Sequence, residues 1–451
     1  MARQLEAAGP AGKEPRVRLE RLLADGTATV AVLGLGYVGL PLALTTAERG
    51  FQVLGFDTDE AKVESLNAGR PYLRHVAADR LLDLLAARRF TASADFARLA
   101  EADVIAICVP TPLTPQREPD LRYVAGTAEV IGAQLRRGQL VVLESTTYPG
   151  TTEELVLPIL GRSGLACGTD FFLAYSPERE NPGDPDGSAR LVPKVVGADD
   201  ESSAELAAAF YRRIAPAVVR VSSARAAEAT KLLENVFRGV NIALVNELKI
   251  IYERMGIDIW EVIDAAATKP FGFMRFDPGP GWGGHCIPID PFYLAWKARE
   301  HGVTTRFIEL AGEINARMPE YVVERISHGL NARGKPVNGA RILLLGMAYK
   351  RDVDDVRESP GFVILDLLTR LGARLSYHDP LVPHTPAMRH FAAFAGLASV
   401  PLDQSILEAQ DAVVVVTAHS GVDYELVRRH AALIVDTRGV FRGGDSHVVR
   451  A

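Results

Sequence analysis

The feature that most constrains the fold is a glycine-rich turn between a short apolar strand and a helix. Thr29–Leu33 (TVAVL) is apolar and rich in β-branched residues, Gly34–Gly39 (GLGYVG) follows at once, and Leu40–Arg49 has a helical pattern. Two further apolar runs, Gln52–Phe56 and Asp103–Val109, predict strands that alternate with helices. Such alternation is typical of a parallel sheet wound with helices, so we expect an α/β fold.

The same turn matches the GxGxxG pattern of a dinucleotide-binding site. Its glycines let the backbone approach a pyrophosphate at a helix N-terminus, and Asp57, which closes the second strand, can accept hydrogen bonds from ribose hydroxyls. A glycine-rich turn without a ligand is the alternative, but the placement of strand, helix and acid favours a dinucleotide. Because Asp57 would repel a 2′-phosphate, NAD is favoured over NADP. The expected cofactor residues of this region are Gly34, Gly36, Tyr37, Val38, Gly39 and Asp57.

The second half of the chain echoes the first after a long helix. From Ala224 to about Met255 apolar residues recur at helical spacing without an internal proline, and a Gly/Pro-rich segment, Pro278–Pro291, follows. Gly, Pro and Asn collect at 331–339 and mark a linker. Beyond it, strands are predicted at Arg341–Leu345, Arg374–Tyr377, Ala412–Val416 and Leu433–Val435, with a helix at Phe362–Leu371. We therefore expect a second, smaller doubly wound domain.

Composition and charge exclude several classes of protein. The 451 residues carry a formal net charge of -6, which gives no general attraction to nucleic acid or to acidic membranes. Residues 1–26 lack the apolar segment of a signal peptide, and no run of about eighteen uncharged apolar residues predicts a membrane span. The three cysteines, Cys108, Cys167 and Cys286, suit a reducing compartment, so we expect a cytoplasmic protein without a disulfide framework.

One cysteine lies in a segment with an unusual composition. Cys286 belongs to Gly281–Asp290 (GWGGHCIPID), which is too rich in glycine for a core and too apolar for a solvated tail. A lone cysteine is usually an inert, buried residue. Here the neighbouring glycines and a carboxylate four residues further on make a nucleophilic cysteine an equal alternative. His285 suggests a zinc ligand, but no Cys/His pairs have metal spacing, so we expect no metal.

Polar residues form a stripe on the long predicted helix. Glu228, Lys231 and Asn235 are spaced so that they share one side of the helix. An ordinary solvated stripe is the more common case. A desolvated lysine, in contrast, can act as a base or hold a developing alkoxide. For Asn246, further along, we expect only a packing or capping role.

Several segments together resemble the UDP-glucose/GDP-mannose dehydrogenase family, over nearly everything from Thr29 to Arg438. The segments are GLGYVGLPLA at Gly34, CVPTPL at Cys108, ESTTYPGTT at Glu144, YSPERENPG at Tyr175, EATKLLENVFRGVNIALVNEL at Glu228, GWGGHCIPIDPFYL at Gly281 and GMAYKRDVDDVRESP at Gly346. The sequence HCIPIDP around Cys286 resembles that of the family branch that oxidises UDP-N-acetylglucosamine or UDP-N-acetylmannosamine. Ile289 stands where the glucose branch typically has a lysine.

The resemblance implies two Rossmann-like domains joined by a central helical region. The expected parts are a polar, flexible leader at 1–28, an NAD-binding domain at 29–220, a central dimerisation domain at 221–330 and a UDP-sugar-binding domain at 336–451. We expect a homodimer or a higher homo-oligomer.

The resemblance also implies a role for individual residues. In the catalytic site we expect Cys286 as nucleophile, Lys231 and Asn235 at the oxyanion, Asp290 with Thr146 ordering a water, and Glu178 assisting acid/base chemistry. Further cofactor residues are Lys62, Thr111, Thr146 and Arg357, and further substrate residues are Gly284, Lys350 and Arg438, together with Glu178, Lys231 and Asn235.

The expected reaction is a four-electron oxidation of the C6 alcohol of a UDP-N-acetylhexosamine to a carboxylate with NAD. Three alternatives stay open: a UDP-glucose 6-dehydrogenase, a two-electron hydroxy-acid type of dehydrogenase that needs no cysteine, and a non-oxidising nucleotide-sugar epimerase or binding protein. Two NADH per sugar would distinguish a four-electron enzyme from the two-electron type, and no net NADH would indicate a non-oxidising protein. A substrate panel is needed to distinguish UDP-glucose from a UDP-N-acetylhexosamine.

Overall fold

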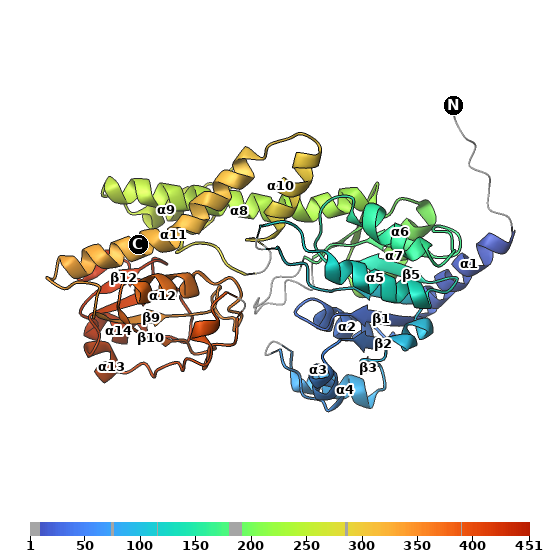
Figure 1. Cartoon of the computed structure of the whole chain (residues 1–451), viewed down its shortest axis with the longest axis horizontal. Helices are drawn as coiled ribbons and strands as arrows, with labels where there is room; N and C mark the ends of the chain where they lie inside the picture. The colour runs from blue at the N-terminus through green and yellow to red at the C-terminus, as the bar shows by residue number, and fades with distance from the viewer. Residues whose placement is uncertain (1–9, 74–75, 115, 180–191, 285–286, 389) are drawn as a thin grey trace. The chain divides into compact units, whose positions relative to one another are not determined.

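The computed structural model describes residues 10–73, 76–114, 116–179, 192–284, 287–388 and 390–451. The chain divides into two compact units (Figure 1). The first takes in the chain up to Glu234 together with 299–301, and the second takes in 235–298 and 302–451. The division falls inside helix α8 (Ala224–Arg254), so the region 221–330, expected as a central domain, contributes to both units.

The first unit is built around a sheet in the order β3-β2-β1-β4-β5-β6-β7-β8. Every neighbouring pair is parallel except β6 and β7. The strands are β1 (Thr29–Leu33), β2 (Gln52–Phe56), β3 (Phe90–Ser93), β4 (Val104–Ile107), β5 (Leu140–Leu143), β6 (Phe172–Tyr175), β7 (Lys194–Gly197) and β8 (Val218–Val221). The helices are α1 (Pro10–Asp25), α2 (Gly39–Glu48), α3 (Glu60–Asn67), α4 (Ala78–Ala86), α5 (Arg122–Gln134), α6 (Leu157–Gly161) and α7 (Glu201–Ile214), with shorter turns at Phe96–Glu101 and Thr152–Val156. The predicted doubly wound α/β fold is confirmed.

The sequence of strand β1 is apolar because the strand is buried on both faces of the sheet. Val30 and Val32 pack into one core cluster, whereas Ala31 and Leu33 pack into another. Successive side chains of a strand point to opposite faces, so both faces of this sheet are covered. A continuous apolar run is therefore the pattern of a buried parallel strand.

The second unit repeats this architecture on a smaller scale. Its sheet has the order β10-β9-β11-β12-β13 and is parallel throughout. The strands are β9 (Arg341–Leu345), β10 (Arg374–His378), β11 (Ala412–Val415), β12 (Ile434–Asp436) and β13 (Val448–Arg450). The helices are α9 (Ile259–Ala266), α10 (Asp290–Glu300), α11 (Arg306–Asn331), α12 (Pro360–Arg370), α13 (Gln404–Glu408) and α14 (Tyr424–His430), with a short turn at Ala392–Phe394. The predicted second doubly wound domain is confirmed.

Helix α8 is the long helix that periodicity predicted. It runs without a break from Ala224 to Arg254, one residue short of the expected end. Among the described residues, no helix is both long and apolar enough to cross a membrane.

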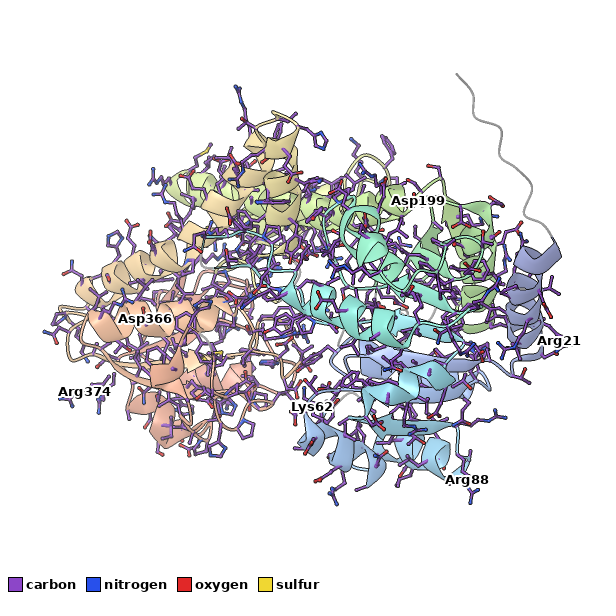
Figure 2. All side chains as sticks on the ribbon, turned by 45° about the vertical axis from the view of Figure 1, so that its right-hand side comes forward. Arg21, Lys62, Arg88, Asp199, Asp366 and Arg374 are labelled. Carbon is purple, nitrogen blue, oxygen red and sulfur yellow. The ribbon has the colours of Figure 1, made fainter. Side chains whose placement is uncertain are left out.

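The segment expected to be a flexible leader is folded from Pro10 onward. Residues 10–25 form α1, in which Leu19 and Leu23 are each only 1% exposed and join the core of the first unit. Arg21 lies on the outer, exposed side of this helix (Figure 2). Leucines four residues apart share one side of a helix, so α1 can bury an apolar side although its average composition is polar.

Replacing Leu23 by alanine should remove about 2–4 kcal/mol from the free energy of unfolding, because it leaves a cavity in a closed core. Urea denaturation of the full chain measures this, with Arg21→Ala as the exposed control on the same helix. Equal stability of the two variants would show that α1 is not part of the core.

Candidate functional site

The glycine turn after β1 is shaped by close backbone contacts. Gly34 has φ +89°, and a Cβ there would lie 2.6 Å from the carbonyl oxygen of Cys108. A Cβ on Gly39 would lie 1.9 Å from the carbonyl oxygen of Gly34. A Cβ on Gly36, in contrast, would meet nothing within 4 Å. The outer glycines are thus required by the fold, and the middle one leaves open space for a pyrophosphate at the start of α2.

Asp57 follows β2 and contacts the glycine turn through Leu35. Its carboxylate accepts hydrogen bonds from the backbone N–H groups of Leu35 and Asp59, each at 3.0 Å. Lys62 of α3 (Figure 2) has its Nζ 3.9 Å from Oδ2 of Asp57. A carboxylate has about four acceptor positions, so two N–H donors leave capacity for ribose hydroxyls. The turn, its open side and this acid fit a dinucleotide.

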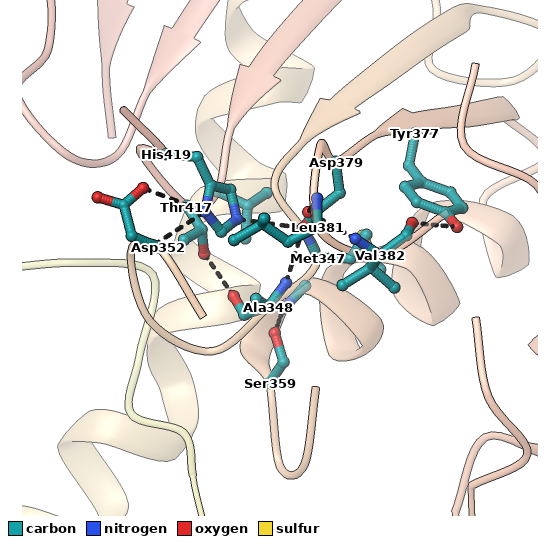
Figure 3. A network of polar contacts seen from close by, with 12 residues as sticks. Met347, Ala348, Asp352, Ser359, Tyr377, Asp379, Leu381, Val382, Thr417 and His419 are labelled. Atoms are coloured by element: carbon teal, nitrogen blue, oxygen red, sulfur yellow. Dashed lines mark hydrogen bonds and ion pairs between the residues drawn. The ribbon is translucent and has the colours of Figure 1, made fainter. Parts of the chain in front are cut away.

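The second unit has a glycine turn in the corresponding place, but the acid beside it has different hydrogen-bond partners. Gly346 follows β9 with φ +84°, and Asp379 follows β10. The Asp379 carboxylate accepts hydrogen bonds from the backbone N–H groups of Met347, Ala348, Leu381 and Val382 at 2.6–3.1 Å (Figure 3). Its side chain is wholly buried. The acid that corresponds to Asp57 is therefore structural here, and this turn does not repeat the ribose site.

His419 completes the set of partners around Asp379. Its Nδ1 accepts a hydrogen bond from the backbone N–H of Asp352 at 3.0 Å, so the proton of the neutral ring is on Nε2 and is donated to Asp379 at 3.2 Å. Burial acts to raise the pKa of Asp379, but the hydrogen bonds from His419 and the backbone outweigh it and hold this pKa below its usual value. The network joins the loop after β9 to the end of β11.

A buried ionic cluster lies beyond the carboxyl ends of β5 and β6. Lys194 Nζ is 2.6 Å from the Glu144 carboxylate and 3.5 Å from that of Glu178, and the Tyr211 hydroxyl donates to Glu144. The antiparallel register of β6 and β7, Tyr175 opposite Gly197, puts Lys194 opposite Glu178.

The charges in this cluster stabilise one another. Burial acts to lower the pKa of Lys194, but Glu144 and Glu178 raise it above its usual value, so the side chain is an ammonium. Burial raises the pKa of Glu144, and the ammonium of Lys194 opposes that effect. Lys194 therefore holds a positive charge against Glu178, one of the predicted catalytic residues.

The polar stripe of α8 is buried, so its reading as an ordinary solvated stripe is wrong. Glu228, Lys231 and Asn235 are at most 7% exposed. Lys231 Nζ donates to the backbone carbonyl of Glu178 at 2.5 Å, which brings two predicted catalytic residues together.

Glu228 holds the segment that follows β5. Its carboxylate accepts hydrogen bonds from the N–H groups of Gly150 and Thr152 and from the hydroxyl of Thr152. Burial raises the pKa of Glu228 to about 7, against the opposing effect of these hydrogen bonds. Thr146 lies in the same segment and is half-buried, and its catalytic and cofactor roles stay predictions.

In the second unit, Asn235 meets Asp290. Asn235 Nδ2 donates to the Asp290 carboxylate at 2.6 Å, and both side chains are buried. Asp290 is the first residue of α10. Cys286, four residues earlier, and His285 lie outside the described residues.

Gly284 is held tightly by its neighbours. It has φ +81°, its N–H donates to the carbonyl of Arg357 at 3.0 Å, and a Cβ would lie 2.8 Å from the Tyr349 ring. The Arg357 guanidinium is paired with Asp355 at 2.6–3.0 Å. Arg357 belongs to the second unit, whereas Thr111, another predicted cofactor residue, is buried beyond β4 in the first. Both assignments stay predictions.

A cationic cavity of about 310 Å³ lies wholly within the second unit. The basic residues that line it are Arg275, Lys350, Arg351, Arg438 and Arg442, and the acid that lines it is Asp277. Of these, Lys350 and Arg438 were predicted to lie near the substrate. A cavity with such an excess of positive charge suits a dianionic diphosphate.

Arg438 is a cation of the cavity that hydrogen bonds hold in place. Its Nε donates to the carbonyl of Val416 at 2.8 Å, and its backbone N–H donates to the Asp436 carboxylate at 2.9 Å. Burial lowers the pKa of Arg438 to about 10, which leaves it charged at neutral pH.

Sequence reasoning missed several residues of these sites. Arg351 and Arg442 reach the cavity from loops far apart in the chain, and Lys194 meets Glu178 only through the register of two strands. No local pattern marks them, because each becomes relevant only when the sheet is assembled.

Comparison with known proteins agrees with this geometry. The chain is 38% identical over 393 residues to a UDP-N-acetyl-D-glucosamine 6-dehydrogenase of Pseudomonas aeruginosa, which covers 87% of this chain and 90% of that protein. A solved structure of a UDP-D-ManNAc dehydrogenase from Pyrococcus horikoshii superposes with a TM-score of 0.84 at 30% identity, over 94% of this chain and 98% of that one. A UDP-glucose dehydrogenase from Pyrobaculum islandicum gives 0.82 at 30% identity, over 94% and 97%.

Three family models match the chain in order along its length. They describe the NAD-binding domain at residues 28–215, the central domain at 225–317 and the UDP-binding domain at 343–443 of one family. The chain is an NAD-dependent nucleotide-sugar dehydrogenase, an oxidoreductase, and it belongs to the UDP-glucose/GDP-mannose dehydrogenase family.

Proposed function

We propose that this chain oxidises the C6 alcohol of a UDP-N-acetylhexosamine, UDP-GlcNAc or UDP-ManNAc, to a carboxylate with NAD. The observation that carries the proposal is the cationic cavity of the second unit, which suits the diphosphate of a nucleotide sugar. The relatives named for UDP-N-acetyl-D-glucosamine and UDP-D-ManNAc support an N-acetylated sugar. Ile289 supports it too, because the glucose branch of the family typically has a lysine there.

The residues of the chain divide the chemistry between them. Bound NAD supplies a hydride acceptor at the open side of the Gly36 turn. Lys231, directly or through water, takes the hydroxyl proton as the alcohol becomes an aldehyde. The Cys286 thiolate then adds to the aldehyde carbon, and Lys231 and Asn235 donate hydrogen bonds to the oxygen of the thiohemiacetal. The thiohemiacetal carbon would then lose its hydride to a second NAD, and the product would be a thioester on Cys286.

Hydrolysis of the thioester completes the reaction. Asp290, Thr146 and Glu178 are the residues that orient or activate the water, and the released thiol is ready for another cycle. The hydrogen bond from Asn235 to Asp290 and the contact of Lys231 with Glu178 support this division, because each links an oxyanion donor to a residue of the hydrolytic step. Capture of the aldehyde on Cys286 explains how two oxidations take place without release.

We place this reaction in the cytoplasm. The chain has only three cysteines, which suits a reducing compartment. A genomic fusion to a redox-sensitive reporter measures the location, and a reporter oxidised in the periplasm would contradict it.

A substrate panel tests the proposed function. The purified chain with NAD is given UDP-GlcNAc, UDP-ManNAc or UDP-glucose, and NADH and product mass are measured. We expect an N-acetylhexosamine to be preferred, with two NADH formed for each sugar carboxylate. A preference for UDP-glucose would change the substrate, one NADH per sugar would indicate a two-electron dehydrogenase, and no net NADH would indicate a non-oxidising protein.

The Cys286→Ser variant should lose turnover on the order of 10³-fold or more, because serine is a far weaker nucleophile at neutral pH. Calorimetry should find unchanged binding of NAD and of UDP-GlcNAc. Cys167→Ser is the matched control and should keep the wild-type rate, because Cys167 is held against Asp200 away from the predicted catalytic residues. Acid formation by Cys286→Ser at the wild-type rate would refute the covalent step.

We also propose that the chain is a homodimer joined through α8. Phe237, Leu244, Ile251 and Met255 are 44–63% exposed and share one side of the helix within the second unit. A second copy can cover such a stripe with its own through a two-fold axis. In light scattering the wild type should have twice the chain mass, and the Leu244→Glu/Ile251→Glu double variant should be a monomer. A monomeric wild type would refute this proposal.

A further inference from the structure

Helix α8 holds Gly279, which directly follows two residues of the cavity wall, by both of its backbone polar groups. The N–H of Gly279 donates to Asn246 Oδ1 at 2.9 Å, and Lys249 Nζ donates to the carbonyl of Gly279 at 3.2 Å. Asn246 and Lys249 are three residues apart in α8, so they present both groups from one side of the helix. Gly279 is thus clamped between an acceptor and a cationic donor.

The clamp is itself fixed by a buried amide network. Asn246 Nδ2 donates to Asn315 Oδ1 at 2.8 Å, and Asn315 Nδ2 donates to the carbonyls of Gly239 and Ala311 at 3.2 and 3.0 Å. These bonds leave only one orientation of the Asn246 amide, with its oxygen toward Gly279. Asn246 therefore does more than the packing or capping role expected from sequence.

Gly279 lies against Arg438, one of the cations of the cavity. A Cβ on Gly279 would lie 2.4 Å from Nη1 of Arg438. The two residues before Gly279, Asp277 and Pro278, line the cavity together with Arg438. A shift of Gly279 would therefore move both the wall and the guanidinium.

Lys249 brings a buried charge to the back of this wall. It is 3% exposed, its Nζ lies 5.6 Å from the centre of the Tyr321 ring, and within the described part of the chain it makes no ion pair. The charged and titratable groups around it are the Glu253–Arg325 pair, the Arg450–Asp258 pair, Tyr321, Asp436 and Arg438. Asp436 is engaged by the N–H groups of Arg438 and Phe441. Glu253 and the C-terminal residue Ala451 line the same space as Lys249, but among the described residues no acid lies within ion-pair distance of its Nζ.

Burial and the neighbouring Arg438 lower the pKa of Lys249 to about 7, although Asp436 acts in the opposite direction. In the ligand-free protein the side chain is then charged below about pH 7 and loses its proton above it. An anion beyond the wall favours the charged form and raises this pKa. Binding should therefore take up a proton, and affinity should fall as pH rises through the ligand-free pKa.

We propose that Lys249 is a positioning residue of the nucleotide pocket, which holds the Asp277–Gly279 wall in place and adds its charge to that of Arg438 in binding the diphosphate. The inference rests on the proposed function, because it takes the cationic cavity as the nucleotide site. Lys249, which does not line the cavity, is thereby one of the residues that determine the affinity for the nucleotide sugar. Binding of the nucleotide sugar should then be linked to protonation of Lys249.

Calorimetric titration with UDP-GlcNAc between about pH 6.5 and 8.5 tests the proposal, because both phosphates of this ligand are esterified and keep their charge over that range. We expect the wild-type Kd to rise about 3- to 10-fold with pH, and heats in buffers of different ionisation enthalpy to report proton uptake. Lys249→Met should bind about tenfold more weakly at pH 6.5, without dependence on pH. Its kcat and its affinity for NAD should change less than about threefold.

Lys335→Met is the matched control, because Lys335 is an exposed lysine of the same unit paired with Asp411. It should reproduce the wild-type pH dependence. Wild-type-like binding by Lys249→Met would overturn the inference while the proposed function stands. If that variant does not fold, pH-independent wild-type binding without proton uptake overturns it instead. Failure of the wild type to bind any UDP-sugar would overturn the proposed function as well.

Discussion

Both units depend on one backbone contact that only glycine allows. After β1, Gly34 lies against the carbonyl of Cys108, which follows the neighbouring strand β4. After β9, a Cβ on Gly346 would lie 2.3 Å from the carbonyl of Thr417, which follows β11. In each sheet the first turn can leave its strand only because no side chain stands between these two backbones. The turns place the start of a loop at the carboxyl edge of the sheet, where ligands of such folds bind.

The two turns then differ in how their acids are used. Asp57 receives two backbone N–H groups and keeps free acceptor capacity, whereas Asp379 is buried among four backbone N–H groups and His419. A carboxylate so surrounded cannot also accept bonds from a ribose. The second unit instead uses its carboxyl edge to carry cations from several loops. The same architecture thus suits two different ligands, depending on whether the acid after the second strand has spare acceptor positions or has all of them occupied by protein donors.

Helix α8 is unusual because five of its polar side chains are buried. Glu228, Lys231, Asn235, Asn246 and Lys249 recur at helical spacing and are all buried, while Leu233, Phe237, Leu244 and Ile251 are exposed. A helix of this length normally buries its apolar stripe and exposes its polar one. Here each buried polar group has a hydrogen-bond partner from another segment, which makes its burial tolerable. The buried polar side chains of α8 thus belong to the sites, and its exposed apolar side chains are left for the proposed partner chain.

The amino-acid sequence by itself determined the elements, the repeat of the two sheets and the dinucleotide turn, because these follow from local periodicity, glycine spacing and one acid at a strand end. β1, β2 and β9 lie where they were predicted. The burial of the α8 stripe, the packing of α1 and the saturation of Asp379 were decided only by the tertiary structure. The cationic cavity and the ion pair of Lys194 with Glu178 were also decided by the tertiary structure, because their charged residues come from separate segments of the chain. Whether a polar side chain is solvated, structural or chemical depends on which backbone groups and charges meet it from other segments, and local sequence does not contain that information.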